Sequence, residues 1–101
     1  MVRITGHDFQ VGESLSSHVE KAVEAGAKRY GIRLVGANAT FAPAPHGKVA
    51  ASILMQAKGH EFFARAEAED ARAAFGDALA EALGQAVKEG TRIKAIERKK
   101  K

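Results

Sequence analysis

The hydrophobic pattern of this chain changes sharply between Phe62 and Phe75. From Phe62 to Ala68, phenylalanine and alanine alternate with mostly charged residues, which is the pattern of a strand with one buried face. From Ala71 onward, apolar residues recur every three or four positions, as in an amphipathic helix. Asp70 stands at the change, where its carboxylate can accept hydrogen bonds from the first free N–H groups of a helix. We therefore predict a strand that leads directly into a long helix.

Three more strands and one more helix are predicted by the same periodicities. Alternation of apolar and polar residues indicates strands over residues 2–5, 35–41 and 49–57. A stripe of apolar residues from Leu15 to Tyr30 indicates a helix that starts near Glu13. Gly12 precedes this helix as an acceptable N-cap, and Gly31 follows it as a stop.

Glycine and proline indicate where these elements end. Residues 42–47 are predicted to be a loop, because the two prolines within them cannot donate to a strand ladder. Lys58 and Gly59 predict a hairpin turn. Gly90 predicts the end of the second helix. Gly26 falls on the inner face of the first helix, where we interpret it as a position of close packing between helix and sheet.

The predicted order of elements is β-α-β-β-β-α, which is an α+β fold. One four-stranded sheet with both helices packed on one face, as in double-stranded-RNA-binding domains, buries every apolar stripe. We expect one domain over residues 1–94 and a basic C-terminal tail over residues 95–101. A ferredoxin-like fold is the alternative, and it would require residues 93–96 to form a closing strand.

Positive charge is concentrated at the C-terminal end of the chain. The net charge is +4. Residues 88–101 hold seven Lys or Arg and two Glu, a net charge of +5, so the rest of the chain carries −1. A polyanionic partner explains this distribution, and so does a solubilising tail.

Several classes of function find no support in the sequence. The chain has no cysteine, no apolar run long enough to span a membrane and no signal-peptide core, so we expect a cytoplasmic protein. It contains no nucleophile–base motif, P-loop or dinucleotide fingerprint, so we expect neither an enzyme nor a cofactor. The four histidines lie apart in the sequence and predict no metal site. Glu67, Glu69 and Arg65 are interpreted as a solvated charge set, and Phe63 as an outward-facing aromatic with a possible contact role.

Cations around the two predicted helices are the remaining functional candidates. On a β-α-β-β-β-α sheet the two helices lie side by side, so these cations could line a ridge that contacts phosphates without reading sequence. The predicted RNA-binding residues are Lys21, Lys28, Arg29, Lys88, Arg92 and Lys94.

One family is similar to this chain from its start to about residue 94. The run Ala64, Ala66, Asp70, Ala74 and Phe75 resembles the strand-to-helix signature of the ribosome hibernation promoting factors, also called the ribosome-associated inhibitor or sigma-54 modulation family. The opening strand, with Val2, Ile4, Thr5 and Gly6, resembles that family's V-x-I-T-G.

The resemblance implies a translation inhibitor that binds the small ribosomal subunit and its rRNA. It would occupy the decoding region, namely the mRNA channel and the A and P sites, and would catalyse no reaction. Short members of the family cooperate with a ribosome modulation factor to pair ribosomes, and we expect a monomer away from the ribosome. A general module for structured RNA and a protein–protein interaction domain are the alternatives.

Overall fold

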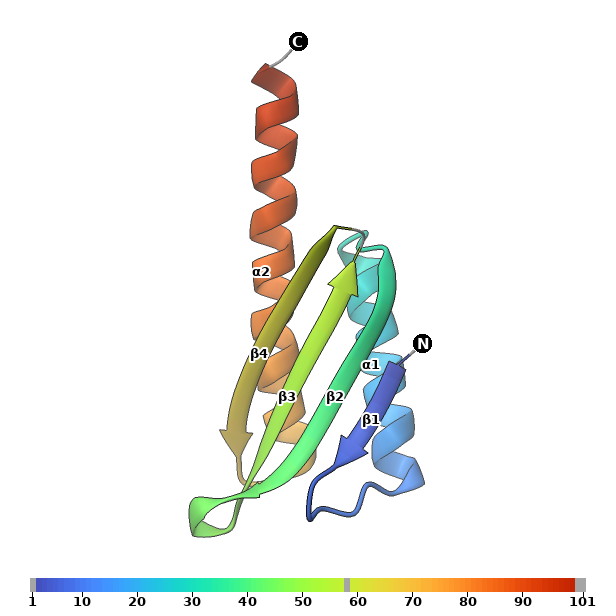
Figure 1. Cartoon of the computed structure of the whole chain (residues 1–101), viewed down its shortest axis with the longest axis vertical. Helices are drawn as coiled ribbons and strands as arrows, with labels where there is room; N and C mark the ends of the chain where they lie inside the picture. Colours follow the sequence, from blue (N-terminus) through green and yellow to red (C-terminus); the bar gives the residue numbers. More distant parts are fainter. Residues whose placement is uncertain (1, 58, 100–101) are drawn as a thin grey trace.

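The fold is one mixed sheet with both helices on the same face (Figure 1). The computed structural model describes the backbone of residues 2–57 and 59–99 and the side chains of residues 2–57 and 59–88. In chain order the elements are β1 Val2–Gly6, α1 Glu13–Arg29, β2 Leu34–Ala44, the short 3-10 helix η1 Pro45–Gly47, β3 Lys48–Ala57, β4 His60–Ala68 and α2 Ala71–Lys99. The predicted β-α-β-β-β-α order and the single four-stranded sheet are confirmed.

The strands lie in the spatial order β1-β2-β3-β4. β1 pairs with β2 in parallel, whereas the β2–β3 and β3–β4 pairs are antiparallel. Because β1 and β4 therefore run in the same direction and each leads into a helix, α1 and α2 also run in the same direction. The C-terminal ends of the two helices lie at the same end of the molecule (Figure 1).

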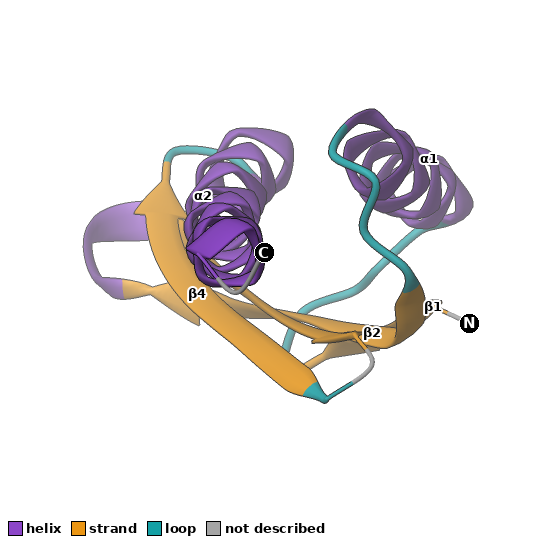
Figure 2. Ribbon diagram, turned by 90° about the horizontal axis from the view of Figure 1, so that it is seen from above, coloured by secondary structure: helices purple, strands orange, loops and turns teal. Residues whose placement is uncertain are grey.

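The hydrophobic core fills the space between the helices and one face of the sheet (Figure 2). Phe41, Ile53 and Met55 from the sheet and Val19 and Phe75 from the helices are fully buried. Most of the other core residues of β2, β4 and α2 are alanines, whose small side chains let the helices approach the strands closely. Among the described side chains no polar or charged residue is buried.

Two predicted boundaries are confirmed by their capping contacts. The Asp70 carboxylate accepts a hydrogen bond from the Ala73 N–H at 2.8 Å, so it caps α2 as predicted. α1 has Gly12 at its N-cap, and its last turn closes through Tyr30, after which Gly31 has a φ of 65°. This left-handed conformation explains a glycine there.

The prediction of a loop over residues 42–47 is wrong for its first half, because β2 continues to Ala44. Pro43 pairs with Val49 in the β2–β3 ladder. The Phe41 carbonyl accepts from the His7 N–H, on the β1 side of the strand. The backbone of Pro43, two residues later, points to the same side of β2, but β1 has already ended there. The N–H that proline lacks would therefore have had no carbonyl of β1 to bond, and no ladder hydrogen bond is lost.

Two further glycine predictions need correction. α2 continues through Gly90 to Lys99. One glycine costs a helix only about 1 kcal/mol, and the residues that follow are mostly good helix formers. This continuation also excludes the ferredoxin-like alternative, because residues 93–96 are helical. Gly26 does mark a close approach, but to the other helix: a Cβ at this position would lie 2.7 Å from Leu83 Cδ1.

Candidate nucleic-acid interface

The end of α1 carries two exposed cations that suit an anionic partner. Lys28 and Arg29 lie in the last turn of the helix, where the negative end of the helix dipole favours positive charge. The Arg29 guanidinium carbon lies 5.6 Å from the centroid of the Tyr30 ring, a distance at which cation–π attraction orients the guanidinium. These two predicted residues therefore lie next to each other, and both are accessible to a partner.

Lys21 lies on the same strip of α1 as Lys28. Seven residues separate them, about 10 Å along a helix axis at 1.5 Å per residue. Glu24 lies between them on this strip, and all three side chains are exposed. Lys21 and Lys28 can thus contact one extended anion, with a carboxylate between them.

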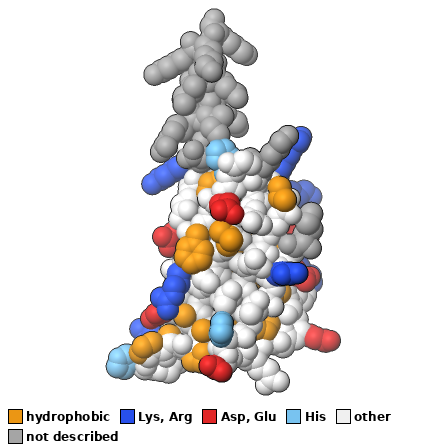
Figure 3. Space-filling model, viewed as in Figure 1, with side chains coloured by type: hydrophobic (Ala, Val, Ile, Leu, Met, Phe, Trp, Pro, Cys, Tyr) orange, Lys and Arg blue, Asp and Glu red, His pale blue; other side chains and the backbone are white. Residues whose placement is uncertain are grey.

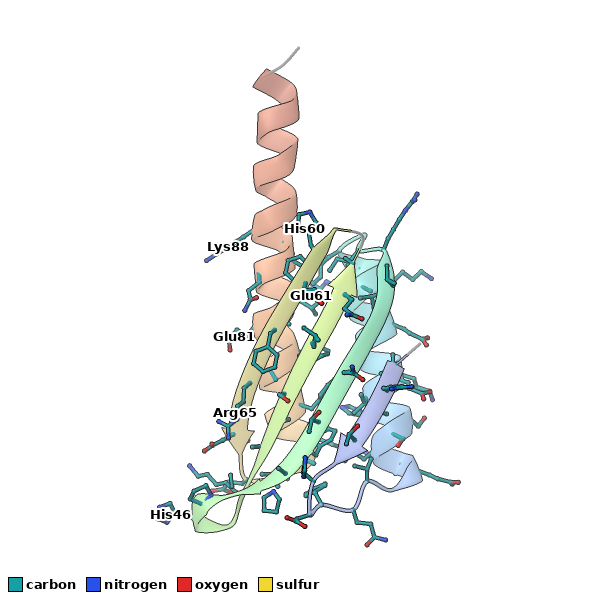
Figure 4. The ribbon with its side chains drawn as sticks, in the orientation of Figure 1. His46, His60, Glu61, Arg65, Glu81 and Lys88 are labelled. Carbon is teal, nitrogen blue, oxygen red and sulfur yellow. The ribbon has the colours of Figure 1, made fainter. Side chains whose placement is uncertain are left out.

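Lys88 lies apart from this group. Figure 4 shows it pointing outward from α2, on the side away from α1. The predicted continuous ridge between the helices is therefore not formed by Lys88. The side chains of Arg92 and Lys94 lie outside the described residues, although the backbone of α2 passes through both positions.

The charge of the two helices is balanced wherever they pack on the sheet. α1 holds three Lys or Arg and three Glu, and residues 71–88 of α2 hold two cations and two carboxylates. Residues 89–101 hold six cations and two Glu, a net charge of +4 that equals the net charge of the whole chain. α2 runs past the end of the sheet in this part (Figure 1). The excess positive charge thus belongs to the protruding end of α2 and the residues after it.

Arg3 is a cation that the sequence interpretation did not select. It lies on the open face of the sheet, beside a hollow of about 330 Å³ lined by Val2, Arg3, Gly36, Ala37, Asn38 and Gln56. The alternation of Val2 and Ile4 with Arg3 already placed the side chain opposite the core, so the signal was present in the sequence.

The other candidates for chemistry have the expected solvated character. Arg65 and Glu67 form an exposed ion pair at 3.0 Å on β4. Phe63 faces outward and is 56% exposed. In the part of the chain that the structure describes, no three histidine or acidic side chains gather where they could hold a metal ion.

Within the same described part, none of the helices combines the length and the apolar character that crossing a bilayer requires.

The fold and its surface define a class of protein: a small α+β domain with the β-α-β-β-β-α order and exposed cations at the C-terminal end of its first helix. A family model described as sigma 54 modulation protein / S30EA ribosomal protein matches residues 2–94. The chain belongs to this family, so the resemblance drawn from Ala64, Ala66 and Asp70 is confirmed.

Solved structures share the fold, and two of them are similar over most of the chain. One is the N-terminal domain of Protein Y from Thermus thermophilus, with a TM-score of 0.74 and 20% identity over 85% of this chain and 93% of that one. The other is a ribosomal subunit interface protein from Coxiella burnetii, with a TM-score of 0.63 and 15% identity over 93% of this chain and 97% of that one. No curated protein matches the sequence.

Proposed function

We propose that this protein binds the small ribosomal subunit and silences translation by occupying the decoding region. The observation that carries the proposal is the family match over residues 2–94, nearly the whole chain. One structural neighbour is itself described as a ribosomal subunit interface protein. Bound in the mRNA channel and the A and P sites, the domain would exclude mRNA and tRNA and would need no catalytic group. This mode of action places the protein in the cytoplasm, with a ribosome modulation factor as its partner in pairing ribosomes.

The contacts that hold the domain there are electrostatic and directed at the rRNA backbone. Lys21, Lys28 and Arg29 form one exposed basic group on α1. Lys88, Arg92 and Lys94 belong to α2, where the chain's excess positive charge begins. Lysine and arginine contacts to phosphate position a protein on RNA without reading its sequence. The affinity of such contacts for RNA falls as the salt concentration rises, because cations from the salt compete for the phosphates.

Co-sedimentation of the protein with purified small subunits over a series of salt concentrations tests this proposal. If six phosphates are engaged, the plot of log affinity against log salt should have a slope of roughly −4 to −5. Failure to co-sediment at low salt would exclude ribosome binding. Equal affinity for arbitrary duplex RNA would instead favour a general structured-RNA module.

We further propose that residues 1–94 form the binding domain and that residues 95–101 strengthen its binding to rRNA. Deletion of residues 95–101 removes four cations and one Glu. The truncated protein should bind subunits modestly more weakly and show a shallower salt slope. An unchanged slope would assign these residues to solubility alone.

A further inference from the structure

The open face of the sheet carries a second group of side chains suited to RNA. This face lies opposite the helices and is uncovered in the described structure (Figure 2). The strand registers place Arg3, Asn38, Leu54 and Phe63 in one row across all four strands, because Arg3 pairs with Asn38, Asn38 with Leu54 and Leu54 with Phe63. A cation, an amide, an aliphatic side chain and an aromatic ring therefore follow one another across the face.

Phe63 provides a flat apolar surface at the β4 end of this row. Its side chain is 56% exposed, and the half-buried Leu54 lies beside it on β3. Figure 3 shows a small cluster of hydrophobic atoms in the middle of this face. The Phe63 carbonyl accepts a hydrogen bond from Gln85 Nε2 of α2 at 2.9 Å, which fixes the backbone that holds the ring. An exposed ring held on a rigid strand is suited to stacking on a nucleobase.

The hollow beside Arg3 lies at the other end of the row. It lies where the β2–β3 register shifts between Leu34 and Gly36, and Gly36 contributes no side chain to fill it. Its volume of about 330 Å³ is near the lower limit of small-ligand pockets. Arg3, Asn38 and Gln56 give its wall a charge and two amides. Adjacent strands are about 4.8 Å apart, so Asn38 lies only about 10 Å from Phe63.

The charges on this face separate the path of a phosphate backbone from the path of its bases. The outward positions of β1 and β2 include Arg3 and no carboxylate, and within the described residues Arg3 forms no ion pair. Both carboxylates of the face belong to β4. Glu61 accepts from Gln56 Nε2 at 3.1 Å, and Glu67 is paired with Arg65. Figure 4 shows Glu61 and Arg65 along β4. Phosphate is thus favoured over β1 and β2, and a base over β3 and β4.

We propose that the open sheet face is a second RNA-binding surface, which takes a single-stranded segment. One base stacks on Phe63 against Leu54, and the backbone passes over the hollow with a phosphate at Arg3. This surface lies on the opposite side of the sheet from the α1 cations. It goes beyond the proposed contacts of the helices, because stacking on an unpaired base needs a single strand, whereas phosphate contacts do not.

The test is the binding of a short, fluorescently labelled oligocytidine to the free protein, measured by anisotropy at moderate salt. Phe63→Ser should weaken binding roughly 5- to 100-fold, the usual range for loss of one base–aromatic stack. Val87→Ser is the control, since it removes an exposed apolar side chain, 40% exposed, from the helix side. It should leave oligocytidine binding unchanged. Both variants change exposed side chains, and thermal unfolding verifies that they fold.

A second pair of variants tests the phosphate position. Arg3→Gln should weaken oligocytidine binding and make the salt slope shallower by nearly one. Lys48→Gln makes the same change of charge at the start of β3. It lies about 20 Å from Arg3, because its partner Ala44 is six residues beyond Asn38 along β2. Lys48→Gln should have the smaller effect.

Several results would overturn the proposal. One is that Phe63→Ser binds oligocytidine as tightly as the wild-type protein. Another is that the control Val87→Ser loses as much affinity as Phe63→Ser. If neither the wild-type protein nor any variant binds oligocytidine but Phe63→Ser weakens ribosome binding, the open face contacts protein instead of RNA. These results are separate from the ribosome test, since a protein that binds subunits through its helices can fail every oligocytidine measurement, and the converse also holds.

Discussion

The two faces of the sheet are made by the same strands but have different roles. On the covered face, Phe41, Ile53 and Met55 are fully buried under the helices. On the open face, the polar side chains of Asn38 and Gln56 and the exposed ring of Phe63 meet solvent. Alternation of side chains along the strands separates the two sets. The covered face therefore determines the stability of the fold, which leaves the open face free to carry function.

The largest expected difference in stability is between variants of two phenylalanines, one on each face. Phe75→Ala leaves a cavity between α2 and the sheet and should lower the free energy of unfolding by about 3–5 kcal/mol. Phe63→Ala on the open face should change it by less than about 0.5 kcal/mol. Urea denaturation of both variants measures the contrast. Similar losses would mean that the open face also contributes to the core.

The contact between α1 and α2 is the part of the covered side where substitution should have the next largest effect on stability. Gly26→Val brings a branched side chain against Leu83 and should destabilise the fold by about 1–3 kcal/mol. Gly84→Val is the control, because nothing lies within 4 Å of a Cβ there, and it should be neutral or slightly stabilising. If Gly26→Val left the free energy of unfolding unchanged in the same denaturation assay, the two helices would not pack as closely at this position as the distance to Leu83 indicates.

The cap of α2 should have a smaller effect. Asp70→Ala removes the acceptor of the Ala73 N–H and should cost about 1 kcal/mol of unfolding free energy. Asp77→Ala, an exposed carboxylate later in the same helix, should cost less, since Asp77 makes no capping bond in the described structure. Equal costs in thermal unfolding would mean that the cap does not stabilise the strand-to-helix junction.

The smallest effect belongs to the ion pair on the open face. Arg65→Ala should change the free energy of unfolding by only about 0.2–0.5 kcal/mol, because both partners are exposed to solvent. High salt should abolish even this difference. A loss above about 1 kcal/mol, persisting in high salt, would contradict the division of roles between the two faces.

Much of the fold follows from the sequence, because each change of period coincides with a real boundary. The alternation from Phe62 to Ala68 and the cap at Asp70 predicted the end of β4 and the start of α2 correctly. Proline and glycine were less reliable guides. Pro43 lies in a strand because β1 ends before it, and no local pattern reveals where a neighbouring strand ends.

The candidate site was predictable in part. Lys28 and Arg29 were selected from the outer side of the first helix, opposite its apolar stripe, and they do lie together at the end of α1. Lys88 was assigned to the same ridge but points away from α1 (Figure 4), because the rotation of α2 about its axis depends on how Leu83 packs against Gly26. The row from Arg3 to Phe63 depends on strand register, which alternation alone does not give.

Ribosome binding by charge-reversed variants tests the central claim most directly. Lys21→Glu with Lys28→Glu should weaken co-sedimentation with small subunits at least roughly tenfold, since charge-assisted contacts each contribute about 1.5–3 kcal/mol. Lys48→Glu with Arg72→Glu makes the same change in net charge at the starts of β3 and α2, away from Lys28 and from Phe63, and should weaken it much less. Equal losses in the two double variants, or none in the first, would contradict a phosphate interface on α1.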